Sequence, residues 1–190
     1  MVTDWGAHHL DIAQWGLGMD GSGPVEVIPP EDPKANRGCT LVYENGVKVI
    51  HGPGAGGEFY GSKGLVQVNR GRFALTVDGE VKFSSLKRGG PSVTSQVALA
   101  EREYLGKAEV KLYESSHHID DFLNCVEKRT KPITNEIVGG GSAICCHLMN
   151  IGYYFHKNVK WDPKTNSFAG GTGDDKWLTR EYRAPYSDPV

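Results

Sequence analysis

Residues 39–50, CTLVYENGVKVI, place Asn45 and Gly46 between two runs of β-favouring side chains. This is the strongest short-range signal for a β-hairpin, because Asn and Gly tolerate the backbone angles of a tight turn between paired strands. The stretch therefore predicts two antiparallel strands, and it indicates that the sheet around them is antiparallel.

The segments that follow extend the same pattern. Residues 73–83, FALTVDGEVKF, carry Asp78 and Gly79 at the turn position. The run GLVQVN at 64–69 is joined to them by a short glycine-containing link, so three strands are expected to form a meander. Two shorter strands are predicted in VEVIPPEDP (25–33) and, as a terminal strand, in VKWDP (159–163).

Three helices are predicted from apolar residues at helical spacing. The first covers about 4–17, the second follows Ser116 as its N-cap and stops at Pro132, and the third begins at Ser142 or a preceding glycine. The expected buried faces are Ile119, Phe122, Leu123 and Val126 on the second helix, and Ile144, Leu148, Ile151 and Phe155 on the third. Residues 84–107 are less patterned and predict a surface excursion.

Hairpins with helices grouped at both ends favour an α+β fold, in which a predominantly antiparallel open β-sheet has helices packed on one face. A single domain is expected over residues 1–190, with the first helix in 1–18 and an irregular polar tail at 162–190. The candidate anchors of that tail are Phe168, Trp177 and Tyr182.

Composition narrows the class of function. The 190 residues include 21 basic and 23 acidic side chains, a net charge of −2, and they show no basic stripe of the kind a nucleic-acid-binding protein needs. No apolar run is long enough to span a membrane, and charged residues interrupt any signal peptide in this chain. The four cysteines show no disulfide framework, which favours free thiols in a reducing compartment and a cytoplasmic location, although export by a signal on a missing N-terminal segment stays open.

Two glycine-rich stretches resemble nucleotide loops in spacing only. GPGAGG at 52–57 fits G-x-G-x-x-G, but the strand-like EFYGSKGLVQV follows it, whereas a dinucleotide-binding fold needs a helix there to hold the pyrophosphate. A hairpin connection or the rim of an active site is favoured. GGGSA at 139–143 opens a predicted helix and could hold an anion, but without the rest of the fingerprint we interpret it as a helix cap and loop.

The strongest chemical signal is DWGAHHLDIAQW at 4–15. Asp4, His8, Asp11 and Trp15 are spaced four, three and four residues apart, so on a helix they share about a third of the circumference. The opposite side, which is expected to face a core, carries Leu10, Ala13 and Leu17.

Three interpretations of this acid–histidine stripe stand at this point. A histidine titrates near neutrality, and a carboxylate one turn away can orient it for proton transfer. Asp and His at this spacing can also reach one metal ion. Finally, the side chains could only solvate a helix for which Asp4 is the N-cap. His9 is rotated by roughly 100° from His8 and does not share the stripe.

Asp4, Gly6, His8 and Asp11 match in place a D-x-G-x-H-x-x-D helix, and through it the chain resembles the Gfo/Idh/MocA family of glucose–fructose oxidoreductases and inositol dehydrogenases. In that family this helix begins the C-terminal domain. Further stretches that resemble a bacterial branch of the family are HHIDDFLNCVEKRTKPI (117–133), SAICCHLMNIGYYFHKNVKWDP (142–163) and REYRAPY (180–186). The likeness is weakest at about 84–110.

The resemblance implies the substrate-side, C-terminal domain of an NAD(P)-dependent oxidoreductase acting on a sugar, polyol or sugar-derived hydroxyl. Asp4 and His8 would be catalytic, and His9, Asp11 and Trp15 would contact substrate. The family's glycine loop and catalytic lysine belong to an N-terminal Rossmann domain that these residues lack. The chain alone is therefore expected to be inactive and to hold no NAD, NADP or metal.

The resemblance also implies partners. A sugar or polyol is the expected small molecule, and a homodimer or higher homo-oligomer is expected to form through sheet strands in the region 39–83. Two alternatives to the oxidoreductase function stay open: a non-catalytic binding or oligomerisation module, and a metal-dependent sugar-processing enzyme.

Overall fold

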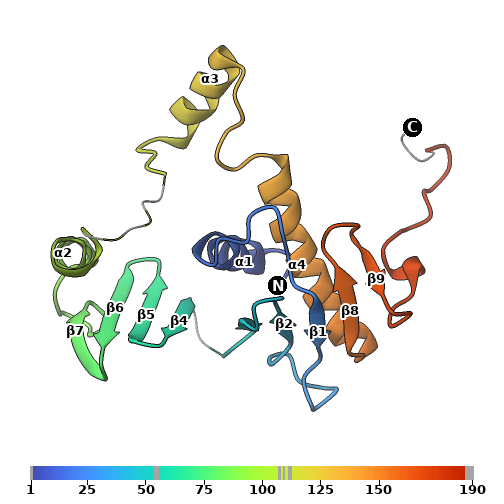
Figure 1. Cartoon of the computed structure of the whole chain (residues 1–190), viewed down its shortest axis with the longest axis horizontal. Helices are drawn as coiled ribbons and strands as arrows, with labels where there is room; N and C mark the ends of the chain where they lie inside the picture. Colours follow the sequence, from blue (N-terminus) through green and yellow to red (C-terminus); the bar gives the residue numbers. More distant parts are fainter. Residues whose placement is uncertain (1, 54–55, 107, 109, 111–112, 187–190) are drawn as a thin grey trace. The chain divides into compact units, whose positions relative to one another are not determined.

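A computed structural model describes residues 2–53, 56–106, 108, 110 and 113–186 (Figure 1). They form two compact units, one from Met1–Pro53 with Thr134–Val190 and the other from Gly54–Ile133. The predicted α+β class is confirmed: α-helices accompany two antiparallel sheets, one of five strands and one of four. The strands expected in one open sheet are divided between these two sheets, because the hairpin of residues 39–50 pairs with β1 (Glu26–Ile28), and β1 pairs on its other side with β8 (Val159–Asp162), from the C-terminal part of the chain.

The first unit contains the five-stranded sheet, in the order β3-β2-β1-β8-β9. The strands are β1 (Glu26–Ile28), β2 (Thr40–Val42), β3 (Lys48–Ile50), β8 (Val159–Asp162) and β9 (Ser167–Ala169). Helix α4 (Glu136–Phe155) packs on β1 and β2, and helix α1 (Trp5–Gly16) packs on α4. Fully buried side chains of the core include Val27, Leu41, Leu148 and Val159.

The two predicted hairpins are confirmed, with different turns. Between β2 and β3, Gly46 has φ +82° while the Asn45 side chain accepts a hydrogen bond from the Val47 amide at 3.1 Å. Between the later strands, Asp78 and Gly79 both have positive φ, +50° and +79°, which is the pattern of a type I′ turn. Glycine removes the steric penalty of positive φ at both sites.

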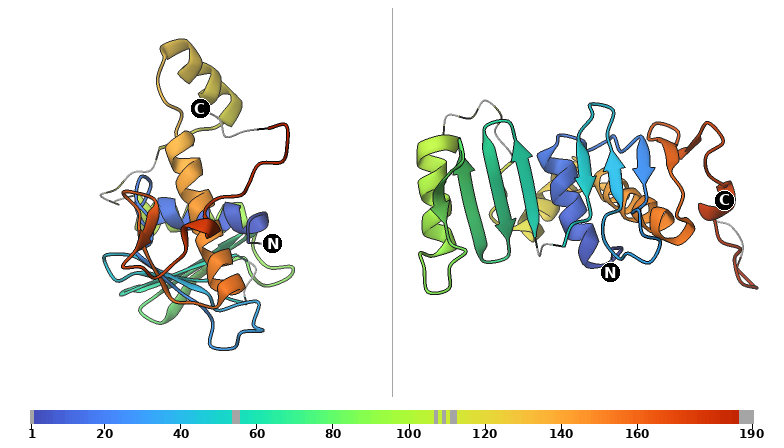
Figure 2. Two further views of the ribbon diagram at one scale, coloured as in Figure 1. Left: turned by 90° about the vertical axis from the view of Figure 1, so that its right-hand side faces the viewer. Right: turned by 90° about the horizontal axis from the view of Figure 1, so that it is seen from below.

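The second unit contains a four-stranded meander, β4-β5-β6-β7, with α2 beside β6 and β7 (Figure 2). Its strands are β4 (Gly57–Gly61), β5 (Gly64–Asn69), β6 (Arg72–Val77) and β7 (Glu80–Ser84). The expected surface excursion at 84–107 is wrong in part, because it contains α2 (Val93–Ala100) and a π-helical turn (Glu101–Leu105). Ser92 caps α2 by accepting a bond from the Ser95 amide at 3.1 Å.

Helix α3 (His118–Lys128) forms as predicted, but its cap and its burial were predicted wrongly. The N-cap is His117, which makes no side-chain capping bond, rather than Ser116. The predicted buried face is between 49% and 56% exposed; it comprises Ile119, Phe122, Leu123 and Val126. Amphipathic spacing identifies the apolar face of a helix, but it does not supply the surface that covers it.

Helix α4 begins earlier than predicted. Its N-cap is Asn135, whose Oδ1 accepts hydrogen bonds from the Ile137 and Val138 amides at 3.0 and 3.4 Å. The glycines at 139–141 and Ser142 therefore lie inside the helix and do not cap it. Of the expected buried face, Leu148 and Ile151 are buried, whereas Phe155 is 43% exposed. A good cap offsets the low helix propensity of glycine.

The tail is more regular than predicted. Strand β8 is not terminal, since it lies between β1 and β9. Phe168 and Trp177 anchor the tail through edge-to-face packing, with ring centroids 5.6 Å apart. Tyr182 is half exposed and does not anchor it.

Two glycines of α4 give opposite predictions for the same substitution. A Cβ at Gly152 would lie 2.7 Å from Cys39 Sγ and 3.1 Å from Val27 Cγ1, whereas one at Gly140 would meet no described atom within 4 Å. We expect Gly152→Ala to lower the free energy of unfolding by roughly 1–3 kcal/mol through overpacking. Gly140→Ala should raise it by about 0.5–1 kcal/mol through helix propensity. Urea denaturation measures both, and equal effects would contradict the close packing of α4 on β1.

Candidate functional site

The predicted stripe lies on the solvent side of α1. Asp4, His8 and Trp15 are exposed and Asp11 is half-buried. The opposite side packs inward as predicted, since Leu10 and Leu17 contact the core of the first unit and Ala13 is half-buried. The stripe is therefore accessible to a ligand over most of its length.

Asp4 and His8 are close in sequence but not joined. Asp4 occupies the N-cap position of α1 without a side-chain capping bond. The His8 ring instead lies against Trp5, with centroids 5.6 Å apart and a tilt of 47°. Among the described residues, no hydrogen bond or ion pair links the Asp4 carboxylate to the His8 imidazole. His9 is half-buried beside them.

Asp11 connects α1 to α4. The buried Ser142 hydroxyl donates a hydrogen bond to Asp11 Oδ1 at 2.7 Å. The pKa of the Asp20 carboxyl is raised above its usual value, chiefly by the partial burial of this group and to a smaller extent by the nearby charge of Asp11. Asp11 is thus held at the junction of two helices, and a second carboxyl lies close to it.

Gln14 was missed by the sequence analysis and is the most constrained polar residue of α1. Its side chain is only 2% exposed. Its Nε2 donates to the carbonyls of Met19 and Ser22 at 3.3 and 3.2 Å, and its Oε1 accepts from the Tyr43 hydroxyl at 2.5 Å. Burial raises the pKa of Tyr43, so this hydroxyl keeps its proton. The available signal was a polar residue placed between the core positions Leu10 and Leu17.

No metal centre is found in the part of the chain that the structure describes, where no three His, Cys, Asp or Glu side chains are grouped to hold an ion. The adjacent Cys145 and Cys146 are buried free thiols, and burial raises the pKa of Cys145 to about 12. His147, the next residue, is exposed.

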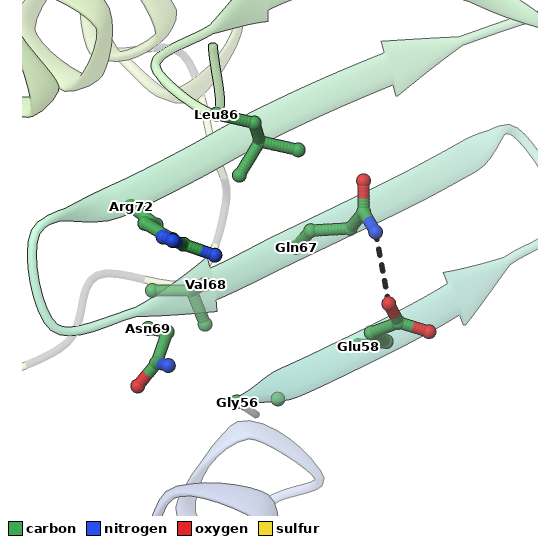
Figure 3. A pocket seen from close by; sticks show the side chains of 8 residues that line it. Gly56, Glu58, Gln67, Val68, Asn69, Arg72 and Leu86 are labelled. Atoms are coloured by element: carbon green, nitrogen blue, oxygen red, sulfur yellow. Dashed lines mark hydrogen bonds between the residues drawn. The ribbon is translucent and has the colours of Figure 1, made fainter. Parts of the chain in front are cut away.

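The glycine-rich stretch at 52–57 lies partly outside the described residues, at 54–55. Gly57 begins strand β4 rather than the helix that a dinucleotide loop requires. A hollow of about 210 Å³ opens beside it, lined by Glu58, Gln67, Arg72 and Leu86 among others (Figure 3). Gln67 Nε2 donates to Glu58 Oε1 at 2.8 Å. This volume is below the ~300 Å³ of typical ligand pockets.

Two further findings concern membrane-spanning helices and similarity to known proteins. No helix in the described ranges is long and apolar enough to cross a membrane. No family model and no curated protein matches the chain.

Loss of Gln14 should destabilise the first unit. We expect Gln14→Ala to lower the free energy of unfolding by about 2–4 kcal/mol, because it removes the acceptor of the buried Tyr43 hydroxyl and the two bonds that Nε2 donates to the Met19 and Ser22 carbonyls. The matched control is Gln67→Ala, whose single bond to Glu58 is exposed and should contribute about 0.5 kcal/mol or less. Equal losses in chemical denaturation would mean that the buried network contributes no more than a surface bond.

Proposed function

We propose that this chain is the substrate-side domain of an NAD(P)-dependent oxidoreductase that acts on a sugar, polyol or sugar-derived hydroxyl. The observation that carries the proposal is the D-x-G-x-H-x-x-D segment on α1, whose His8 faces solvent while Asp11 is anchored on α4. A solvent-facing imidazole on an anchored helix can take a proton from a bound hydroxyl.

The described residues do not themselves fit a dinucleotide. A nicotinamide held by a separate Rossmann domain would accept the hydride. His8 would accept the hydroxyl proton, and Asp4 would orient His8 or the substrate. His9, Asp11 and Trp15 would contact the substrate around them. This assignment requires Asp4 and His8 to come together when substrate binds, since catalytic hydrogen bonds are often long before binding.

Two other functions are alternatives to this one. The separation of Asp4 from His8 favours a non-catalytic binding or oligomerisation module. A metal-dependent enzyme would require ligands beyond the described residues.

Exposed apolar side chains in 39–83, including Ile50, Tyr60 and Val81, support the proposed homo-oligomer. The free cysteines support the proposed cytoplasmic location.

Cofactor binding gives the first test of the assignment. We expect isothermal titration of this chain with NADH to show no saturable binding below about 100 μM, because no strand–glycine loop–helix unit lies among the described residues. A full-length oxidoreductase of the Gfo/Idh/MocA family is the positive control. Saturable binding in this range would contradict the assignment to a substrate-side domain.

The second test separates the two histidines. With the chain fused behind a Rossmann domain of the same family, His8→Ala should lower kcat by about 10²–10⁴-fold while cofactor affinity stays nearly unchanged. His9→Ala is the matched control and should cost less, chiefly in KM, because His9 lies roughly 100° from the stripe. A larger loss of kcat from His9→Ala would remove the role assigned to His8.

A further inference from the structure

A larger hollow opens in the first unit, on a different side of α4 from α1. Its volume is about 490 Å³, within the usual range of ~300–1,000 Å³ for small-molecule sites. Ser142 bonds to α1, whereas Ile151 lines the hollow nine residues later. Nine residues rotate a helix by about two and a half turns, so these two side chains leave α4 in opposite directions. The hollow is therefore separate from the stripe on α1.

The inner surface of the hollow is apolar and held in place. Leu148, Ile151 and Trp161 line it and are buried. Phe155 and Trp177 stack on each other beside them, with centroids 3.9 Å apart and planes within 10°. Such packing fixes the positions of the aromatic rings, so the surface is largely formed before any ligand binds.

Apart from Ile144 and Leu178, the remaining lining is polar. His147, Asn150 and Asn166 line the hollow, and their side chains make no hydrogen bond or ion pair with any described residue. Tyr154 also lines it and is 83% exposed. The buried indole N–H of Trp161 has no acceptor in the described part of the chain. A buried donor without a partner is uncommon and costly.

The chemistry of this lining selects one class of ligand. The described lining contains no Asp, Glu, Lys or Arg, and the nearby Lys157 ammonium lies over the Trp177 ring, 5.6 Å from its centroid, in a cation–π contact. A charged ligand would therefore lose hydration without gaining a counter-ion from the lining. A purely apolar ligand would leave the amides unpaired. A ring with an apolar C–H face and several hydroxyl groups satisfies both surfaces. We propose that the hollow binds a neutral carbohydrate or cyclic polyol, at a site separate from the one on α1.

Direct binding measurements on this chain test the proposal. Tryptophan fluorescence and saturation-transfer NMR would follow titrations with D-glucose, D-galactose, N-acetyl-D-glucosamine and myo-inositol. At least one should saturate with a Kd of about 1 mM, as expected for a small ligand in an open site. Glucuronate and glucosamine should bind at least about tenfold more weakly than their neutral parent. Absence of saturation by every neutral compound up to about 50 mM, or preference for a charged one, would overturn the proposal.

Substitutions of lining residues test whether the sugar binds in this hollow. Tyr154→Ala and Asn150→Ala should each weaken binding by about 5–10-fold through lost contacts. Tyr154 is largely exposed, so its replacement should leave the fold intact, as circular dichroism would verify. Tyr113→Ala, at an exposed tyrosine of the second unit, is the matched control and should leave the affinity unchanged. Loss of binding with His8→Ala, but not with Tyr154→Ala, would place the sugar on α1 and overturn the proposal, while leaving the proposed function intact.

Discussion

The buried amide of Gln14 fixes how α1 sits on the rest of its unit. It donates to two carbonyls after the helix and accepts from Tyr43 next to β2, so rotation of α1 would break three hydrogen bonds, of which the bond to Tyr43 is buried. His8 is six residues earlier and lies about 120° around the helix. Because Gln14 is held inward, His8 is held outward. The outward face of α1, which carries His8, is therefore set by a buried residue on its inner side.

Helix α4 serves both candidate sites because its sides differ in composition. Gly152 allows α4 to approach Cys39 and Val27 closely. Ser142 bonds to α1 on another side, and Ile151 lines the aromatic hollow opposite to it. A long helix in close contact with a sheet cannot move one side without moving the other, since packed interiors deform little. Both sites therefore share one rigid support.

The elements that could be predicted from the sequence are those fixed by local chemistry. The turns at Asn45-Gly46 and Asp78-Gly79 need only their own backbone preferences. The start of α4 could have been read from Asn135, but the glycines at 139–141 weigh against a helix when propensity is considered alone. The contacts of Gln14 with Tyr43 and of Asp11 with Ser142 join residues 29 and 131 positions apart. Spacing within one helix carries no information about such partners.

The two carboxylates of the stripe on α1, Asp11 and Asp4, differ in how firmly their side chains are held. Ser142 fixes Asp11 through one carboxylate oxygen, which leaves the other oxygen able to accept a bond from a ligand hydroxyl. Asp4, at the N-cap, has no such anchor on its side chain. His8 lies between a fixed acid and an unanchored one. Under the proposed function, a ligand hydroxyl held by Asp11 would lie one helical turn from His8, and movement of Asp4 towards the imidazole would complete the arrangement that proton transfer requires.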